Sequence, residues 1–104
     1  MRRRRRRPSL ERVPEFVVEL YVSRVDDTTA WRSSERARLA AAEVNGEGTA
    51  VRYLRSILVP EDETCFYLYE AGSADAVREA VQRAGLRFER ITAAVVEPRR
   101  RGSR

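Results

Sequence analysis

The residues of this sequence whose side chains could do chemistry together are one cysteine, one glutamate, one arginine and several tyrosines. A thiolate and a carboxylate can bind a metal ion, and a guanidinium can hold a carboxylate or phosphate through two parallel hydrogen bonds. Tyrosine rings can stack on a ligand, and their hydroxyls can hydrogen-bond to it. The candidate binding residues are Glu19, Tyr21, Tyr53, Arg55, Cys65, Tyr67 and Tyr69.

Cys65 is the single cysteine, so the chain forms no internal disulfide. A thiolate close to Arg55 would have a lowered pKa and could act as a redox thiol or a metal ligand. The alternative is a small buried apolar residue, which is the common situation of a lone cysteine. Both interpretations stay open on the sequence.

Glu19 and Arg55 could clamp a polar ligand, or they could form an ion pair across the sheet or across a subunit interface. Tyr67 and Tyr69 are spaced like the stacking aromatics of RNA-recognition domains, but the flanking glycine and basic residues are missing. We expect them to lie in a subunit interface. The chain has no histidine, and we find no nucleophile beside a base and no phosphate-binding glycine loop. Whether it is an enzyme is therefore left open.

Charge is concentrated at the two ends of the chain. Residues 1–10 carry six arginines and no acid, and residues 99–104 carry four arginines, whereas residues 11–98 hold 11 arginines against all 16 acids. We expect a disordered leader over 1–12, one domain over 13–97 and a disordered basic tail over 98–104. Nucleic acid could then bind only through the ends. Because no apolar stretch is long enough to cross a bilayer, we expect a cytoplasmic protein.

Apolar periodicity predicts six elements between the ends. Strands are expected over 15–22, 49–59, 64–71 and 91–97, because apolar residues alternate or β-branched residues gather there. A helix should start at Asp26 to Thr29 and reach about Val44, with Trp31 as an anchor. A second helix should follow the N-cap Ser73 and end at Gly85.

This order, strand-helix-strand-strand-helix-strand, predicts an α+β fold of ferredoxin-like type: a four-stranded antiparallel sheet with two helices on one face. The other face would be bare. We expect Glu19, Tyr21, Tyr53, Arg55, Cys65, Tyr67 and Tyr69 to lie on it.

The segments 15–21, 55–71 and 76–86 resemble a bacterial family of small ferredoxin-like proteins of unknown function, one member of which is described as nickel-binding. The resemblance covers about residues 14–97. It implies a homodimer in which two sheets close an α+β barrel around a cavity, and it implies nickel binding. Cys65 and Glu19, with tyrosine oxygens, form the one ligand set that could share a face. Because the resemblance starts near Val13, we also hypothesise that translation begins there.

The leading prediction is a binding protein that holds a small ligand or a metal ion such as nickel in a cavity between two sheets of a dimer. An alternative is a cofactor-free oxidase or monooxygenase of the α+β-barrel kind, although no histidine is present to act as its base. A further alternative is a nucleic-acid accessory protein that acts through its arginine-rich tails.

Overall fold

The computed structural model describes residues 13–21 and 27–95, and in them four strands and two α-helices follow one another in the predicted order. The predicted leader and basic tail lie outside the described residues. No helix in the described part is long and apolar enough to span a membrane. The elements are β1 (Glu15–Tyr21), α1 (Asp27–Gly46), β2 (Val51–Val59), the 3-10 helix η2 (Pro60–Asp62), β3 (Thr64–Ala71), α2 (Ala74–Arg83) and β4 (Arg90–Ala94).

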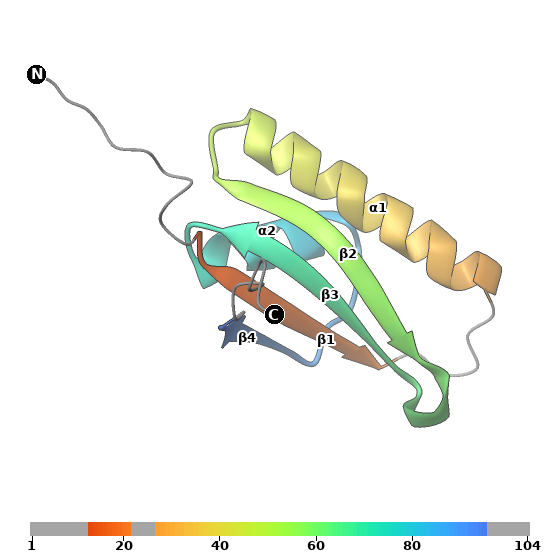
Figure 1. The fold of residues 1–104 in the computed structure, drawn as a ribbon. Coiled ribbons are helices and arrows are strands. Elements are labelled where there is room, and N and C mark those ends of the chain that lie inside the picture. Colours follow the sequence, from red (N-terminus) through yellow and green to blue (C-terminus); the bar gives the residue numbers. More distant parts are fainter. Residues whose placement is uncertain (1–12, 22–26, 96–104) are drawn as a thin grey trace, which may run out of the picture.

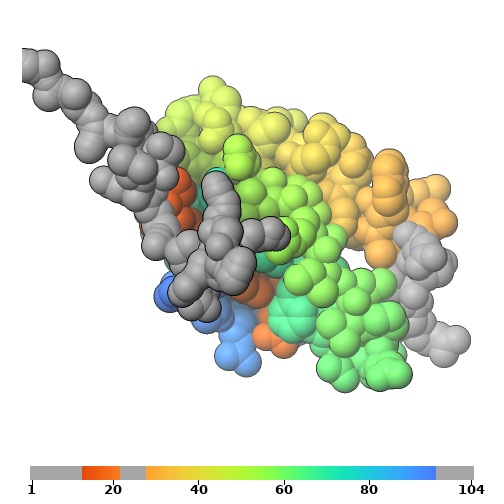
Figure 2. Space-filling view, in the orientation of Figure 1, coloured from red at the N-terminus to blue at the C-terminus, as the bar shows by residue number. Residues whose placement is uncertain are grey.

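The strands form one antiparallel sheet in the order β2-β3-β1-β4. Both helices lie on the same side of this sheet, and α1 runs along the edge strand β2 (Figure 1). In the space-filling view, the side chains of β2 lie between those of α1 and those of β1 and β4 (Figure 2). The predicted ferredoxin-like α+β fold is confirmed. We call the two sides of the sheet the helix face and the open face.

Local sequence explains where the elements begin and end. In β1, every second residue from Phe16 to Leu20 is buried, as the two-residue repeat of a strand requires. At the start of α2, the Ser73 side chain accepts a 3.2 Å hydrogen bond from the amide of Ala76. The chain leaves this helix at Gly85, whose φ of 76° suits a residue without a Cβ atom.

The longer helix packs with small side chains. Ala37, Ala40, Ala41 and Val44 of α1 are buried, whereas Leu39 between them is 52% exposed. Trp31, predicted as an anchor, is 67% exposed. That prediction was wrong, because the buried residues of α1 lie in its later turns, and Trp31 near its start stays outside the contact.

Ionic and hydrogen-bond contacts join the two helices. The Arg83 guanidinium at the end of α2 lies 2.6 Å from a carboxylate oxygen of Glu47 and also contacts Glu43 and Glu79. The hydrogen bonds that Arg83 donates to Glu47 lower the pKa of the Glu47 carboxyl. Arg36 of α1 donates from Nε to the carbonyl oxygen of Ala84, which lies at the C-terminal end of α2. These contacts fix the two helices as one layer.

The alternating side chains of β3 point the opposite way from our prediction. Cys65, Tyr67 and Tyr69 are buried on the helix face, with exposed fractions of 6%, 2% and 0%. The register pairs Tyr67 with Val18 and Tyr69 with Phe16, which both belong to the core. Our placement of these residues on the open face was wrong. The strand has large apolar side chains on both faces, so its alternation alone does not tell which face is buried.

A β-bulge in β2 corrects the placement of Tyr53 as well. The register shifts between Tyr53 and Arg55, so that Tyr53 pairs with Tyr69 on the helix face and Arg55 pairs with Leu68 on the open face. We predicted both on the open face because they are two residues apart. The extra residue, Leu54, breaks that two-residue repeat and sends their side chains to opposite sides.

Three tyrosine rings from β2 and β3 therefore meet under the helices. The Tyr53 ring meets Tyr67 and Tyr69 edge to face, with centroids 5.9 and 5.7 Å apart. Burial raises the pKa of Tyr67 to about 12 and raises the pKa of Tyr69 as well. The buried Tyr69 hydroxyl has no hydrogen-bond partner among the described residues.

We predict that the folded state loses stability in alkaline solution. In the unfolded chain Tyr67 ionises near its ordinary pKa of 10.0, whereas in the folded protein it stays neutral to about 12. The unfolded state thus binds fewer protons between these values, and the free energy of unfolding should fall by about 1.4 kcal/mol per pH unit for each such tyrosine. Urea denaturation between pH 10 and 12 measures this slope.

The double variant Tyr67→Phe/Tyr69→Phe should flatten that slope, since it removes both hydroxyls. As a control, Tyr69→Phe at neutral pH should leave stability unchanged or higher, because it deletes a buried hydroxyl without a partner. If the free energy of unfolding of the double variant fell equally steeply with pH, the loss of stability could not come from these two tyrosines.

Candidate functional site

The open face of the sheet has an apolar centre. Val17 on β1 and the β3 residues Phe66 and Leu68 are half-buried there, on the two central strands. Ile57 extends this centre onto β2 and is 45% exposed. Both helices cover the other side of the sheet, so neither covers these side chains. We call this set the apolar stripe.

Two cross-strand ion pairs flank the apolar stripe. On β2 and β3, Arg52 Nη2 lies 3.4 Å from Glu70 Oε1. On β4 and β1, Arg90 Nε lies 3.3 Å from Glu19 Oε1. Each pair joins residues directly opposite each other in the register, so the sheet itself sets these contacts.

Arg55 is the open-face arginine that makes no ion pair within the described residues. It is exposed, and its register partner is the apolar Leu68. Within the described residues Glu19 and Arg55 do not form an ion pair across the sheet, because Glu19 pairs with Arg90 instead. Both residues do lie on the open face, as predicted, but the central strand β3 separates their strands. A guanidinium beside apolar side chains can bind an anion with all of its donors.

Tyr21 is at the end of β1 and is 58% exposed. Its hydroxyl donates a 2.8 Å hydrogen bond to Glu63 Oε1, and this bond raises the pKa of Tyr21. Glu63 has the left-handed φ of 50° just before β3 starts. Tyr21 therefore holds the β2–β3 turn and lies at the rim of the open face.

The residues predicted to bind a metal do not come together. Cys65 pairs with Leu20 on the helix face, whereas Glu19 pairs with Phe66 on the open face. Burial raises the pKa of the Cys65 thiol, which disfavours the thiolate that a metal needs. No group of three or more histidine, cysteine or acidic side chains in the described parts of the chain could hold a metal ion. The donor set found here does not fit nickel.

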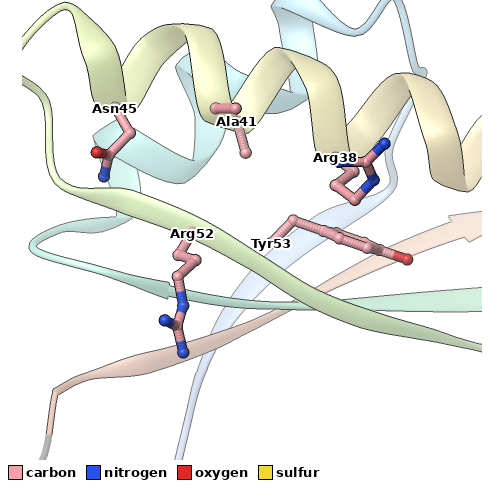
Figure 3. A pocket seen from close by; sticks show the side chains of 6 residues that line it. Arg38, Ala41, Asn45, Arg52 and Tyr53 are labelled. Atoms are coloured by element: carbon pink, nitrogen blue, oxygen red, sulfur yellow. The ribbon is translucent and has the colours of Figure 1, made fainter.

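A hollow lies on the helix side, between α1 and the edge strand β2 (Figure 3). Its volume is about 290 Å³, near the lower end of small-molecule sites. Arg38 and Asn45 point toward it from α1, with Ala41 between them, and the Tyr53 side chain extends from β2 beneath Arg38. It is lined by Arg38, Ala41, Ala42, Asn45, Arg52 and Tyr53.

The sequence analysis missed several residues of these two surfaces. Phe66 and Leu68 were not named, because Cys65, Tyr67 and Tyr69 of the same strand were placed on the open face, and Arg52 and Arg90 became relevant only through their register partners. The spacing of Arg38, Ala41 and Asn45 places them on one helical face, and this could have been noticed in the sequence. The spacing does not tell which strand lies opposite that face.

The topology and the bare sheet face define a small ferredoxin-like α+β protein. The family model described as "Nickel responsive protein SCO4226-like" matches residues 20–93. The chain therefore belongs to the SCO4226-like family of nickel responsive proteins. A comparison with curated proteins found no match.

The fold is also that of a solved structure, the crystal structure of SCO4226 from Streptomyces coelicolor A3(2). The two share 18% sequence identity with a TM-score of 0.69, over 81% of this chain and 99% of that chain. At this identity the likeness establishes the fold. It agrees with the resemblance found in the sequence.

We predict that Cys65 is unreactive in the folded protein. Its raised pKa and 6% exposure should slow its reaction with Ellman's reagent at neutral pH by about tenfold or more relative to the protein in urea. Equal rates in the folded and unfolded protein would show that the thiol is accessible and would contradict the position given to it here.

Proposed function

We propose that this protein is a small-ligand-binding homodimer in which the open faces of two copies enclose the ligand. The observation that carries the proposal is the open face itself, with an apolar stripe at its centre and ion pairs on both sides. An apolar centre with a polar rim is the usual anatomy of a protein interface. A twofold axis would place the apolar stripe of one copy against that of the other. The dimer implied by the family resemblance supports the same partner.

Arg55 indicates which ligand the enclosed space would hold. Covering the open face would remove its guanidinium from water, and a buried cation without a counter-charge is strongly destabilising. Among the described residues, Glu19 and Glu70 already have arginine partners. An organic anion with an apolar body would pair with Arg55 and lie on the apolar stripe.

Nickel is named in the description of the family, but the ligand proposed here is not a nickel ion. The donor set of the described residues offers no cluster of ligands, and the sequence contains no histidine. An apolar organic acid therefore fits the open face better than a metal ion does.

The assembly can be tested with the full chain by native mass spectrometry. We expect a dimer for the unmodified protein and a monomer for Leu68→Arg, because the variant places a charge in the apolar stripe. Leu39→Arg is the matched control: Leu39 is 52% exposed on α1, so this variant should stay dimeric. Circular dichroism verifies that both variants fold. An unmodified protein that is monomeric would reject the proposal.

Ligand binding can be tested by calorimetry with octanoate, using neutral octanamide as the chemical control. If Arg55 binds the carboxylate, octanoate should bind about tenfold or more tightly than octanamide, and Arg55→Gln should abolish the difference. Arg32→Gln, an exposed arginine of α1, should keep it. Equal binding of both compounds to the unmodified protein would reject an anion site at Arg55.

A further inference from the structure

The hollow between α1 and β2 lies on the other side of the sheet from the open face, and nothing in the proposed function uses it. Its walls come from the helix α1 and the edge strand β2. Ala41 is buried in the core, and Asn45 Nδ2 donates a 2.9 Å hydrogen bond to the carbonyl oxygen of Val51 at the start of β2. This bond ties the last turns of α1 to the edge strand and closes one end of the hollow (Figure 3).

The β-bulge gives the hollow its aromatic wall. The register shift after Tyr53 directs this side chain to the helix face of an edge strand, and bulges commonly redirect a side chain beside a binding site. Behind it, Tyr67 and Tyr69 hold the ring edge to face. Arg38 lies above the ring, and the small side chains of Ala41 and Ala42 line the hollow on the α1 side. A hollow lined by a fixed aromatic ring and by alanines suits a planar apolar body.

Polar groups lie at the two ends of this hollow. Arg38 and Asn45 are seven residues apart on α1, which is about 10 Å along a helix axis. The Asn45 amide nitrogen is already used by Val51, so its oxygen is the group left to accept a hydrogen bond. At the other end, Arg38 is tied to Glu35 through Nη2, which leaves most of its five donors available. The Arg52 guanidinium points away from the hollow and pairs with Glu70, so only its stem contributes.

We propose that the hollow between α1 and β2 is a binding site for a small planar aromatic acid. The carboxylate pairs with Arg38, the ring packs against Tyr53 and the alanines, and a hydroxyl at the far end donates to Asn45. The Arg38–Glu35 pair opposes this binding only weakly, because it is exposed and such pairs contribute little. Glu35 acts as a competing carboxylate for the same guanidinium.

The experiment is an amide-resolved NMR titration of the full chain with para-hydroxycinnamate. We expect saturable chemical-shift changes at the amides of Arg38, Asn45 and Tyr53, with half-saturation at about 1 mM or below. Arg38→Gln should weaken binding about tenfold or more, whereas Glu35→Gln should strengthen it about twofold to fivefold by freeing the guanidinium. A purely structural role of the Arg38–Glu35 pair would not give opposite effects from its two members.

Controls separate this site from the open face and from general charge effects. Arg32→Gln and Arg55→Gln should both leave the affinity unchanged, so the outcome is independent of whether Arg55 binds its own anion. Neutral para-hydroxycinnamide should bind about tenfold or more weakly. Ala42→Leu, at an exposed helical position that lines the hollow, should fill the space and abolish binding while circular dichroism remains unchanged.

Three results would overturn the proposal: no saturable shifts, shifts confined to other parts of the chain, or an affinity that Arg38→Gln leaves unaltered.

Discussion

The pairing of β3 with both β1 and β2 is the constraint on which the rest of the structure depends. Because Tyr67 and Tyr69 pair with Val18 and Phe16, the whole strand has one orientation about its axis. That orientation buries the aromatic rings and the thiol under the helices. The same orientation puts Phe66 and Leu68 on the open face. A shift of the register by one residue would exchange the two sets.

The bulge in β2 is the second geometric constraint, and it affects both candidate sites. One inserted residue sends Tyr53 to the helix face and Arg55 to the open face. The edge strand thereby supplies an aromatic wall to one surface and the guanidinium of Arg55 to the other. A regular strand would have placed both side chains on the same face and left the hollow beside α1 without its ring.

Several carboxylates of the described residues pair with arginines: Glu19 with Arg90, Glu70 with Arg52, and Glu47 with Arg83. A carboxylate held by a guanidinium must give up that partner before it can bind a cation. The lone cysteine is buried with a raised pKa. Family membership and a shared fold do not by themselves assign a metal site to the described residues, because function depends on the site rather than on the fold.

The sequence by itself determined the elements, their order and the ferredoxin-like fold. Period-two alternation in β1, the cap at Ser73 and the glycine at the end of α2 are local signals that depend on neighbouring residues only. The sequence also gave Glu19 and Arg55 their correct face. Only the tertiary structure decided which face of β3 is buried, where β2 is bulged and which arginine each glutamate meets. These outcomes depend on pairing with strands far away in the chain, and a two-residue repeat with apolar residues on both faces has no local feature that selects between them.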